Sequence, residues 1–354
     1  MQLGIIGLPL SGKTTLFNAV THGTRPTGRS SAKLEIHTAV VDVPDARVDQ
    51  LTEMFRPKRT IYAKITYLDF AGLEGGRETI AGPLLNQLAQ MDGLVHVVRC
   101  FEDESVPHPL GSIDPERDIS LMDSELLLND LVSVERRLER LNEERHKGGV
   151  KDKAAADREV ALFGRLKEAL ESEVPLRDLS FEDEELTLLS GFGLLTLKPV
   201  LVVLNEGEDQ SAPAIPYEHA RSQVIALKGN LEMEIAQLPP DEASAFLEEY
   251  GIAEPVLNRV IRLSYELLGL QSFLTAGEDE VRAWTVHRGA LAPEAAGVIH
   301  SDMQKGFIRA EVVSYDDLMT LGTMAEARAK GKLRLEGKDY AVQDGDILNI
   351  RFTS

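Results

Sequence analysis

The chain of 354 residues carries 58 acidic against 38 basic side chains, a formal charge of −20, and 43% of its residues are apolar. This length predicts two or three domains, and the apolar content is typical of a soluble globular protein. The negative charge argues against DNA binding by bulk electrostatics, because phosphates attract a basic surface. A local basic patch for an RNA-rich partner remains compatible with it.

No apolar run approaches the roughly 18–20 residues that cross a bilayer, so we expect no membrane partner. Cys100 is the single cysteine, which excludes an intramolecular disulfide. No signal peptide is apparent before the first apolar segment. These features favour the reducing cytoplasm.

A glycine-rich loop follows the first apolar segment. Residues 3–6 read as a buried strand, the next residues are Gly7-Leu8-Pro9-Leu10-Ser11-Gly12-Lys13-Thr14, and residues 15–20 begin a helix. In the pattern G-x-x-x-x-G-K-[ST], glycines let backbone N–H groups surround phosphate oxygens, and the helix dipole faces them. Lys13 can reach the β- and γ-phosphates, and the Thr14 hydroxyl can ligate Mg²⁺. The sequence therefore predicts a P-loop, with a chance glycine-rich turn as the alternative.

A second switch element stands at the end of another apolar segment. Residues 63–68 read as a strand that runs into Asp69-Phe70-Ala71-Gly72, the pattern D-x-x-G. In a switch, the aspartate acts on Mg²⁺ and the glycine N–H senses the γ-phosphate. The alternative is an ordinary strand-to-turn pair. Leu73 follows, where many switch GTPases carry a glutamine that orients water, so we expect slow hydrolysis.

Two further strands are predicted over residues 93–100 and 199–204. Ligands of an open α/β sheet bind at the carboxyl ends of its strands. The second strand delivers Asn205-Glu206-Gly207-Glu208, where GTP-specific proteins carry N-K-x-D. The pattern N-x-x-E therefore predicts weakened guanine specificity. His96 lies inside the first apolar run and is interpreted as a core histidine.

Residues 118–190 change to a charged helical pattern. Apolar residues at helical spacing form two stripes: Leu128, Leu131, Val134, Leu138 and Leu141, and then Ala156, Val160, Phe163, Leu166 and Leu170. Gly148-Gly149 lies between them and predicts a turn. Two antiparallel helices then form a coiled-coil hairpin. It is either a projecting arm, which the charge density favours, or a helical pair lying on the core.

The last third of the chain returns to helix and then to short strands. Residues 257–263 and 265–269 are helical in pattern. Alternating segments follow over residues 281–286, 307–313 and 347–352. About 80 residues of strands with one helix between them predict a compact α+β module. The residues of this module indicate an interaction domain rather than a catalytic one.

The chain resembles the YchF/Obg-like ATPase family of P-loop proteins related to translation factors. The resemblance covers nearly the whole sequence. It is carried by the P-loop, Leu16-Phe17-Asn18-Ala19, Val43-Pro44-Asp45, residues 69–73 and 96–102, and most specifically by Leu270-Gln271, Thr275-Ala276-Gly277, residues 280–285, 306–310 and 336–340, and Asp344-Gly345-Asp346.

This resemblance implies an α/β fold: a Ras-like P-loop G domain with a coiled-coil helical insertion and a C-terminal β-grasp (ubiquitin-like) TGS domain. We assign residues 1–117 and 191–273 to the G domain, 118–190 to the insertion and 274–354 to the TGS domain. The family implies an NTP hydrolase that uses ATP, or ATP and GTP, with Mg²⁺ as cofactor and the ribosome or a ribosomal subunit as partner. Leu73 matches the hydrophobic residue that the family carries in place of the glutamine.

The resemblance also implies roles position by position. The residues that would wrap the phosphates are Leu10, Ser11, Gly12, Lys13, Thr14 and Thr15. Lys13 and Thr14 would be catalytic, Thr14 and Asp69 would ligate the metal, and Gly72 would contact the nucleotide. Asn205 and Glu206 would flank the purine with Glu208 nearby. Phe101 corresponds to an aromatic residue packed near the base.

Two departures from the family support an alternative. Lys33 stands where the first switch of the family has a threonine that completes the Mg²⁺ shell, and the second switch, over residues 73–82, is shorter. Both favour, as the second hypothesis, a non-hydrolysing nucleotide-gated binding module. A small-molecule kinase is the third, disfavoured because no arginine-rich lid is apparent.

Overall fold

The computed structural model describes residues 1–24, 35–71, 82–146, 152–250 and 252–353. Contacts divide the chain into two compact units, of which the first holds residues 1–39 and 66–260 and the second holds residues 40–65 and 261–354. The domain limits assigned from the sequence stay predictions. The units differ from them because residues 40–65 and 261–273 group with the C-terminal module.

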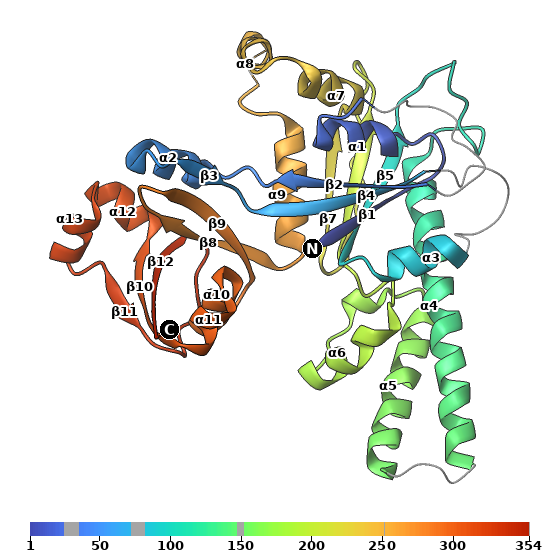
Figure 1. The fold of residues 1–354 in the computed structure, drawn as a ribbon. Helices are drawn as coiled ribbons and strands as arrows, with labels where there is room; N and C mark the ends of the chain where they lie inside the picture. Colours follow the sequence, from blue (N-terminus) through green and yellow to red (C-terminus); the bar gives the residue numbers. More distant parts are fainter. Residues whose placement is uncertain (25–34, 72–81, 147–151, 251, 354) are drawn as a thin grey trace. The chain divides into compact units, whose positions relative to one another are not determined.

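The first unit is built on a sheet with the strand order β2-β4-β1-β5-β6-β7 (Figure 1). Its strands are β1 (Gln2–Ile6), β2 (Glu35–Asp42), β4 (Lys64–Ala71), β5 (Gly93–Cys100), β6 (Val200–Glu206) and β7 (Ser222–Leu227). β1 pairs in parallel with β4 and β5, and the parallel ladder continues through β6 to β7. Parallel strands are covered on both faces, which explains why β5 and β6 are almost continuously apolar.

Helices pack around this sheet. α1 (Lys13–Thr21) contacts α7 (Gly229–Gln237), and α3 (Gly82–Ala89) and the beginning of α4 (Pro115–His146) contribute to a core shared with the strands. In that core, Leu88 of α3 and Met122 of α4 join Val98 of β5 and Val202 of β6. The remaining helical segments of the unit are η1 (Leu176–Asp178), α6 (Asp183–Leu189), η2 (Ser190–Phe192), α8 (Pro240–Glu249) and the first turn of α9 (Val256–Leu267).

The predicted helical pair is formed by α4 and α5 (Lys153–Glu171). Arg145 pairs with Asp157 at 2.8 Å and Glu135 with Lys167 at 2.8 Å, so the two helices run antiparallel. Their core includes Val134, Phe163, Leu166 and Leu170, as the stripes predicted. The turn expected at Gly148-Gly149 lies outside the described residues.

Leu128 is a correction to the predicted stripe, because it is 53% exposed. Leu126 packs into the core of the sheet, whereas Leu127 packs against the core of the helical pair. Successive helix positions are rotated by about 100°, so Leu128 points away from both cores. The helix passes from one core to the other at this point.

The second unit contains a mixed sheet with the order β11-β10-β12-β8-β9-β3. Its strands are β3 (Arg59–Ile61), β8 (Leu270–Ala276), β9 (Glu280–His287), β10 (Phe307–Ser314), β11 (Arg334–Glu336) and β12 (Asp346–Phe352). Its helices are α2 (Ala46–Phe55), α10 (Ala292–Ile299), α11 (Ser301–Lys305), α12 (Tyr315–Leu321) and α13 (Met324–Ala329), together with the end of α9. The expectation of one helix among the C-terminal strands was wrong, because helices of five to eight residues are too short to show a clear period.

Residues 40–65 belong to the second unit through a strand and an ion pair. β3 pairs in parallel with β9, with Arg59 opposite Glu280. Arg47 of α2 donates to Asp45 at 2.8 Å and to Asp344 at 2.8 Å. In chain order, this segment stands between the two predicted switch positions, Lys33 and Gly72.

Candidate nucleotide-binding site

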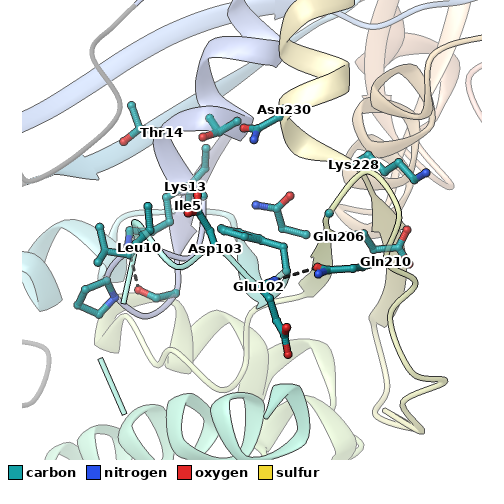
Figure 2. Close-up of a pocket in the computed structure, with 18 of the residues that line it drawn as sticks. Ile5, Leu10, Lys13, Thr14, Glu102, Asp103, Glu206, Gln210, Lys228 and Asn230 are labelled. Atoms are coloured by element: carbon teal, nitrogen blue, oxygen red, sulfur yellow. Dashed lines mark hydrogen bonds between the residues drawn. The ribbon is translucent and has the colours of Figure 1, made fainter. Parts of the chain in front are cut away.

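A cavity of about 570 Å³ lies in the first unit at the carboxyl ends of β1, β5 and β6. Its wall is formed by the P-loop, the start of α1, and the loops that follow β5, β6 and β7 (Figure 2). The polar and charged side chains that line it are Lys13, Thr14, Thr15, Asp69, Glu102, Asp103, Asn205, Glu206, Glu208, Asp209, Gln210, Lys228 and Asn230. This is the edge at which parallel α/β sheets bind ligands.

The P-loop requires both of its glycines. Gly7 has φ +144° and a Cβ there would lie 2.2 Å from the Val97 carbonyl oxygen. Gly12 has φ +101° and its Cβ would lie 2.1 Å from Asn205 Nδ2. Gly12 is also the N-cap of α1 and no side chain caps this helix. Such an N-terminus is suited to bind a phosphate.

Lys13, Thr14 and Asp69 are brought together on the cavity wall. Lys13 Nζ donates to the carbonyl oxygens of Gly7 at 3.1 Å and Leu8 at 2.9 Å. Thr14 Oγ1 donates to Asp69 Oδ2 at 3.1 Å, and Asp69 is fully buried within β4. A hydroxyl and a carboxylate side by side form the hard-oxygen donor set that Mg²⁺ prefers.

Asn205 connects two walls of the cavity. Its Nδ2 donates to the Ser11 carbonyl oxygen at 3.0 Å, and its Oδ1 accepts from the Gly229 N–H at 3.0 Å. Both ends of the buried amide are therefore engaged within the protein. Asn205 holds the P-loop to the start of α7, and its assigned place beside the purine stays a prediction.

The other residues assigned from the sequence are placed as follows. The residues Leu10, Gly12, Thr15, Phe101, Glu206 and Glu208 line the cavity, whereas Ser11 is buried and does not line it. Glu206 Oε1 accepts from the Ala212 N–H at 2.6 Å, and the Glu208 carbonyl oxygen accepts from Lys228 Nζ. Gly72, Leu73 and Lys33 lie outside the described residues.

Burial shifts the pKa values of His96 and Cys100 in β5. Burial, and then the charge of Lys13, lower the pKa of His96 to about 3, so the imidazole is neutral. Its burial agrees with the interpretation as a core histidine. Burial, and then the charges of Glu206 and Asp118, raise the pKa of Cys100 to about 12. The thiol is therefore protonated at neutral pH and is a weak nucleophile.

Several cavity residues were not predicted from the sequence. Gln210 follows the N-x-x-E pattern by two residues, and Lys228 and Asn230 follow β7. For Lys228 and Asn230 the sequence did carry a signal, because residues 224–227 are apolar and polar residues follow them, as after β6. For Gln210 no local pattern was available, since its role depends on the neighbouring loop.

Comparisons with known proteins decide the family. A family model named YchF-GTPase_C, described as a protein of unknown function (DUF933), matches residues 270–353. The ribosome-binding ATPase YchF of Bacillus subtilis (strain 168) is 42% identical, with 99% of each chain covered. The chain belongs to the YchF family. The YchF protein of Escherichia coli O157:H7 is 40% identical over 99% of each chain. Obg-like ATPase 1 of Oryza sativa subsp. japonica is 36% identical over 99% of this chain and 92% of its own.

The YchF fold is confirmed by a solved structure. The structure of the Schizosaccharomyces pombe YchF GTPase matches with a TM-score of 0.84 and 30% identity, covering 99% of this chain and 97% of its own. The mixed α/β architecture with a helical insertion and a C-terminal domain is thus the YchF architecture. Among the described residues, no helix is long and apolar enough to span a bilayer.

Proposed function

We propose that this YchF-family chain binds and slowly hydrolyses ATP, alone or alongside GTP, and couples its nucleotide state to binding of the ribosome in the cytoplasm. The observation that carries the proposal is the meeting of Lys13, Thr14 and Asp69 at one cavity. It is supported by full-length relatives named ribosome-binding ATPases. The helical pair and the C-terminal module, which we take as a TGS domain, would contact the ribosome.

The residues of the site divide into phosphate-binding and metal-binding groups. The P-loop N–H groups and Lys13 would hold the phosphates at the start of α1. Thr14 and Asp69 would hold Mg²⁺, which neutralises charge on the phosphates when bound. Asn205 fixes the P-loop before a ligand enters, through its bond to Ser11. When hydrogen-bond donors are already held in place, little conformational entropy is lost as the ligand binds.

The loop after β6 supports a preference for adenine. GTP readers use an aspartate two residues after their lysine, whereas Glu206 and Glu208 occupy these positions here. Glu206 is engaged by the Ala212 N–H. A chain without the lysine and aspartate lacks the usual groups for guanine, so ATP is the expected ligand.

The first experiment is titration calorimetry with Mg²⁺-ATP and Mg²⁺-GTP. We expect ATP to bind at least as tightly as GTP, and Lys13→Ala to weaken both by about tenfold or more, because a charge-assisted contact is lost. Strong preference for GTP would overturn the base assignment alone. Absence of binding to either nucleotide would overturn the proposed function.

The second experiment separates an enzyme from a switch. Phosphate release is measured with and without ribosomes against the Lys13→Ala control, and ribosome co-sedimentation is compared in ATP and ADP. Release above the control supports hydrolysis. Nucleotide-dependent co-sedimentation without release would instead establish the non-hydrolysing, nucleotide-gated binding module.

A further inference from the structure

Arg99 is a charged residue inside a buried strand. It is the second-last residue of β5 and is 2% exposed. Within the described part of the chain, it forms no ion pair with a carboxylate. Burial lowers the pKa of Arg99, and the charge of Asp103 opposes this shift. A buried charge without a close counter-charge is costly. Other contacts must therefore stabilise the guanidinium at this position.

The guanidinium of Arg99 spans the loop that follows β5. Its Nε donates to the Phe101 carbonyl oxygen at 3.0 Å, and its Nη2 donates to the Val106 carbonyl oxygen at 2.7 Å. The guanidinium carbon also lies 4.4 Å from the centre of the Phe101 ring. Arg99 thus joins the two ends of the loop and covers one face of its aromatic residue.

This loop is one wall of the cavity. Phe101, Glu102, Asp103 and Val106 all line it. The loop is also stabilised internally, because Asp103 Oδ1 accepts from the Ser105 N–H at 2.9 Å. Its conformation therefore decides the shape that a ligand meets on this side.

Gln210 connects the same wall to the loop after β6. Its Oε1 accepts from the Glu102 N–H at 2.8 Å, and Figure 2 shows this bond between the two labelled residues. Gln210 lies close to Gly207, since a Cβ at Gly207 would be 2.6 Å from Gln210 Oε1. The loops after β5 and β6 are therefore held as one surface.

We propose that Arg99 and Gln210 are positioning residues for the purine base. Arg99 supports the Phe101 ring on one face, so that the base packs on a wall that is already ordered, and Gln210 keeps the two loops of this wall together. Neither residue acts on the phosphates. The inference rests on the proposed function. Arginine suits the position because its planar guanidinium can donate in two directions while it stacks on an aromatic ring. A lysine ammonium cannot do both at once.

The test compares a ligand with a base and a ligand without one. Calorimetry measures binding of Mg²⁺-ATP and of Mg²⁺-tripolyphosphate to the full chain. We expect Arg99→Met to weaken ATP about tenfold, from the loss of one cation–π contact and two hydrogen bonds, and to leave tripolyphosphate within about twofold. Arg99→Lys should be intermediate, since it keeps only the charge.

Gln210 provides a matched pair of variants on a partly exposed loop, where folding is not at stake. Gln210→Met loses the acceptor for the Glu102 N–H and should weaken ATP about threefold to fivefold. Gln210→Glu keeps an acceptor oxygen for the Glu102 N–H, so the ratio of ATP affinity to tripolyphosphate affinity should stay near that of the wild type. Thermal unfolding of each variant checks that the fold is intact.

The outcomes distinguish this inference from the proposed function. Equal losses for ATP and tripolyphosphate would overturn the positioning role, because they indicate a general structural defect. Unchanged ATP affinity in both Arg99→Met and Gln210→Met would overturn it as well, while leaving the nucleotide site standing. A wild-type chain that binds neither ATP nor GTP would refute the proposed function, and this inference with it.

Discussion

Leu10 shows how the phosphate site constrains a single residue. It has φ +63°, the left-handed region, and it lines the cavity. A leucine there costs about 1–2 kcal/mol relative to its ordinary conformations, whereas asparagine tolerates this region. The P-loop pattern leaves this position open, so the constraint is visible only in the structure.

We therefore expect Leu10→Asn to raise the free energy of unfolding of the first unit by about 0.5–1 kcal/mol. Leu10→Ala is the control, because alanine loses the leucine side chain without gaining tolerance of a positive φ. Urea unfolding measures both variants. An asparagine variant no more stable than the alanine variant would contradict the strain argument.

His96 predicts a pH dependence at the residue scale. Its folded-state pKa is about 3, below the ordinary 6.5. Between these values the unfolded chain binds a proton that the folded chain does not, so stability is present above pH 6.5 and is lost as the pH falls. The raised pKa of Asp130, about 6 and caused by burial, acts in the opposite direction.

We expect the wild type to lose about 1–2 kcal/mol more than His96→Met between pH 7 and pH 5. Asp130 is present in both proteins, so its contribution cancels in the difference. Unfolding in urea at a series of pH values gives the result. Parallel curves for the two proteins would show that His96 does not titrate as inferred.

At the scale of elements, Asp130 fixes α4 to the segment that leads into β6. Its Oδ1 accepts from the Leu195 N–H at 2.8 Å, and its Oδ2 accepts from the Thr196 N–H at 2.7 Å and from Thr196 Oγ1 at 2.6 Å. These groups are buried, and 65 residues or more separate them in sequence. A carboxylate on a charged helix gave no sign of this role.

Asp130→Ala is expected to destabilise the first unit by about 3 kcal/mol, because it leaves two buried backbone N–H groups without an acceptor. Glu139→Ala, at an exposed position of the same helix, should change stability by less than about 0.5 kcal/mol. Chemical unfolding compares them. Similar effects of the two substitutions would rule out the anchoring role.

At the scale of the whole molecule, the second unit is assembled from two distant parts of the chain. Residues 40–65 supply β3 and α2, and Arg47 ties them to Asp344. Burial disfavours the charged arginine, but hydrogen bonds and charges of Asp45 and Asp344 outweigh it and raise the pKa of Arg47. Arg47, Asp45 and Asp344 thus form an ion-pair network within the second unit.

Arg47→Met should destabilise the second unit by about 1–2 kcal/mol after allowance for solvent screening, since one partner of the network is partly exposed. Lys58→Met is the matched control: its pair with Asp279 leaves both side chains about 80% exposed and contributes little. Hydrogen exchange in β3 and β9 reports the change. Equal exchange in the two variants would contradict this account.

The sequence by itself determined the parts of this protein that are local. The P-loop, the strand over residues 93–100, the antiparallel helical pair and the YchF family are all readable from contiguous patterns, because strand burial, helix period and phosphate binding each constrain neighbouring residues. The sequence also identified Gly7 and Gly12, although the atoms that leave no room for a Cβ there belong to Val97 and Asn205, which are distant in sequence.

Only the tertiary structure decided which residues hold these parts together. Asn205 bonds to Ser11 across 194 positions, Asp130 anchors the segment before β6, and residues 40–65 complete a C-terminal sheet. The physical reason is the same in each case. A hydrogen bond or a strand pairing depends on which groups the fold brings within about 3 Å, and sequence spacing does not encode that distance.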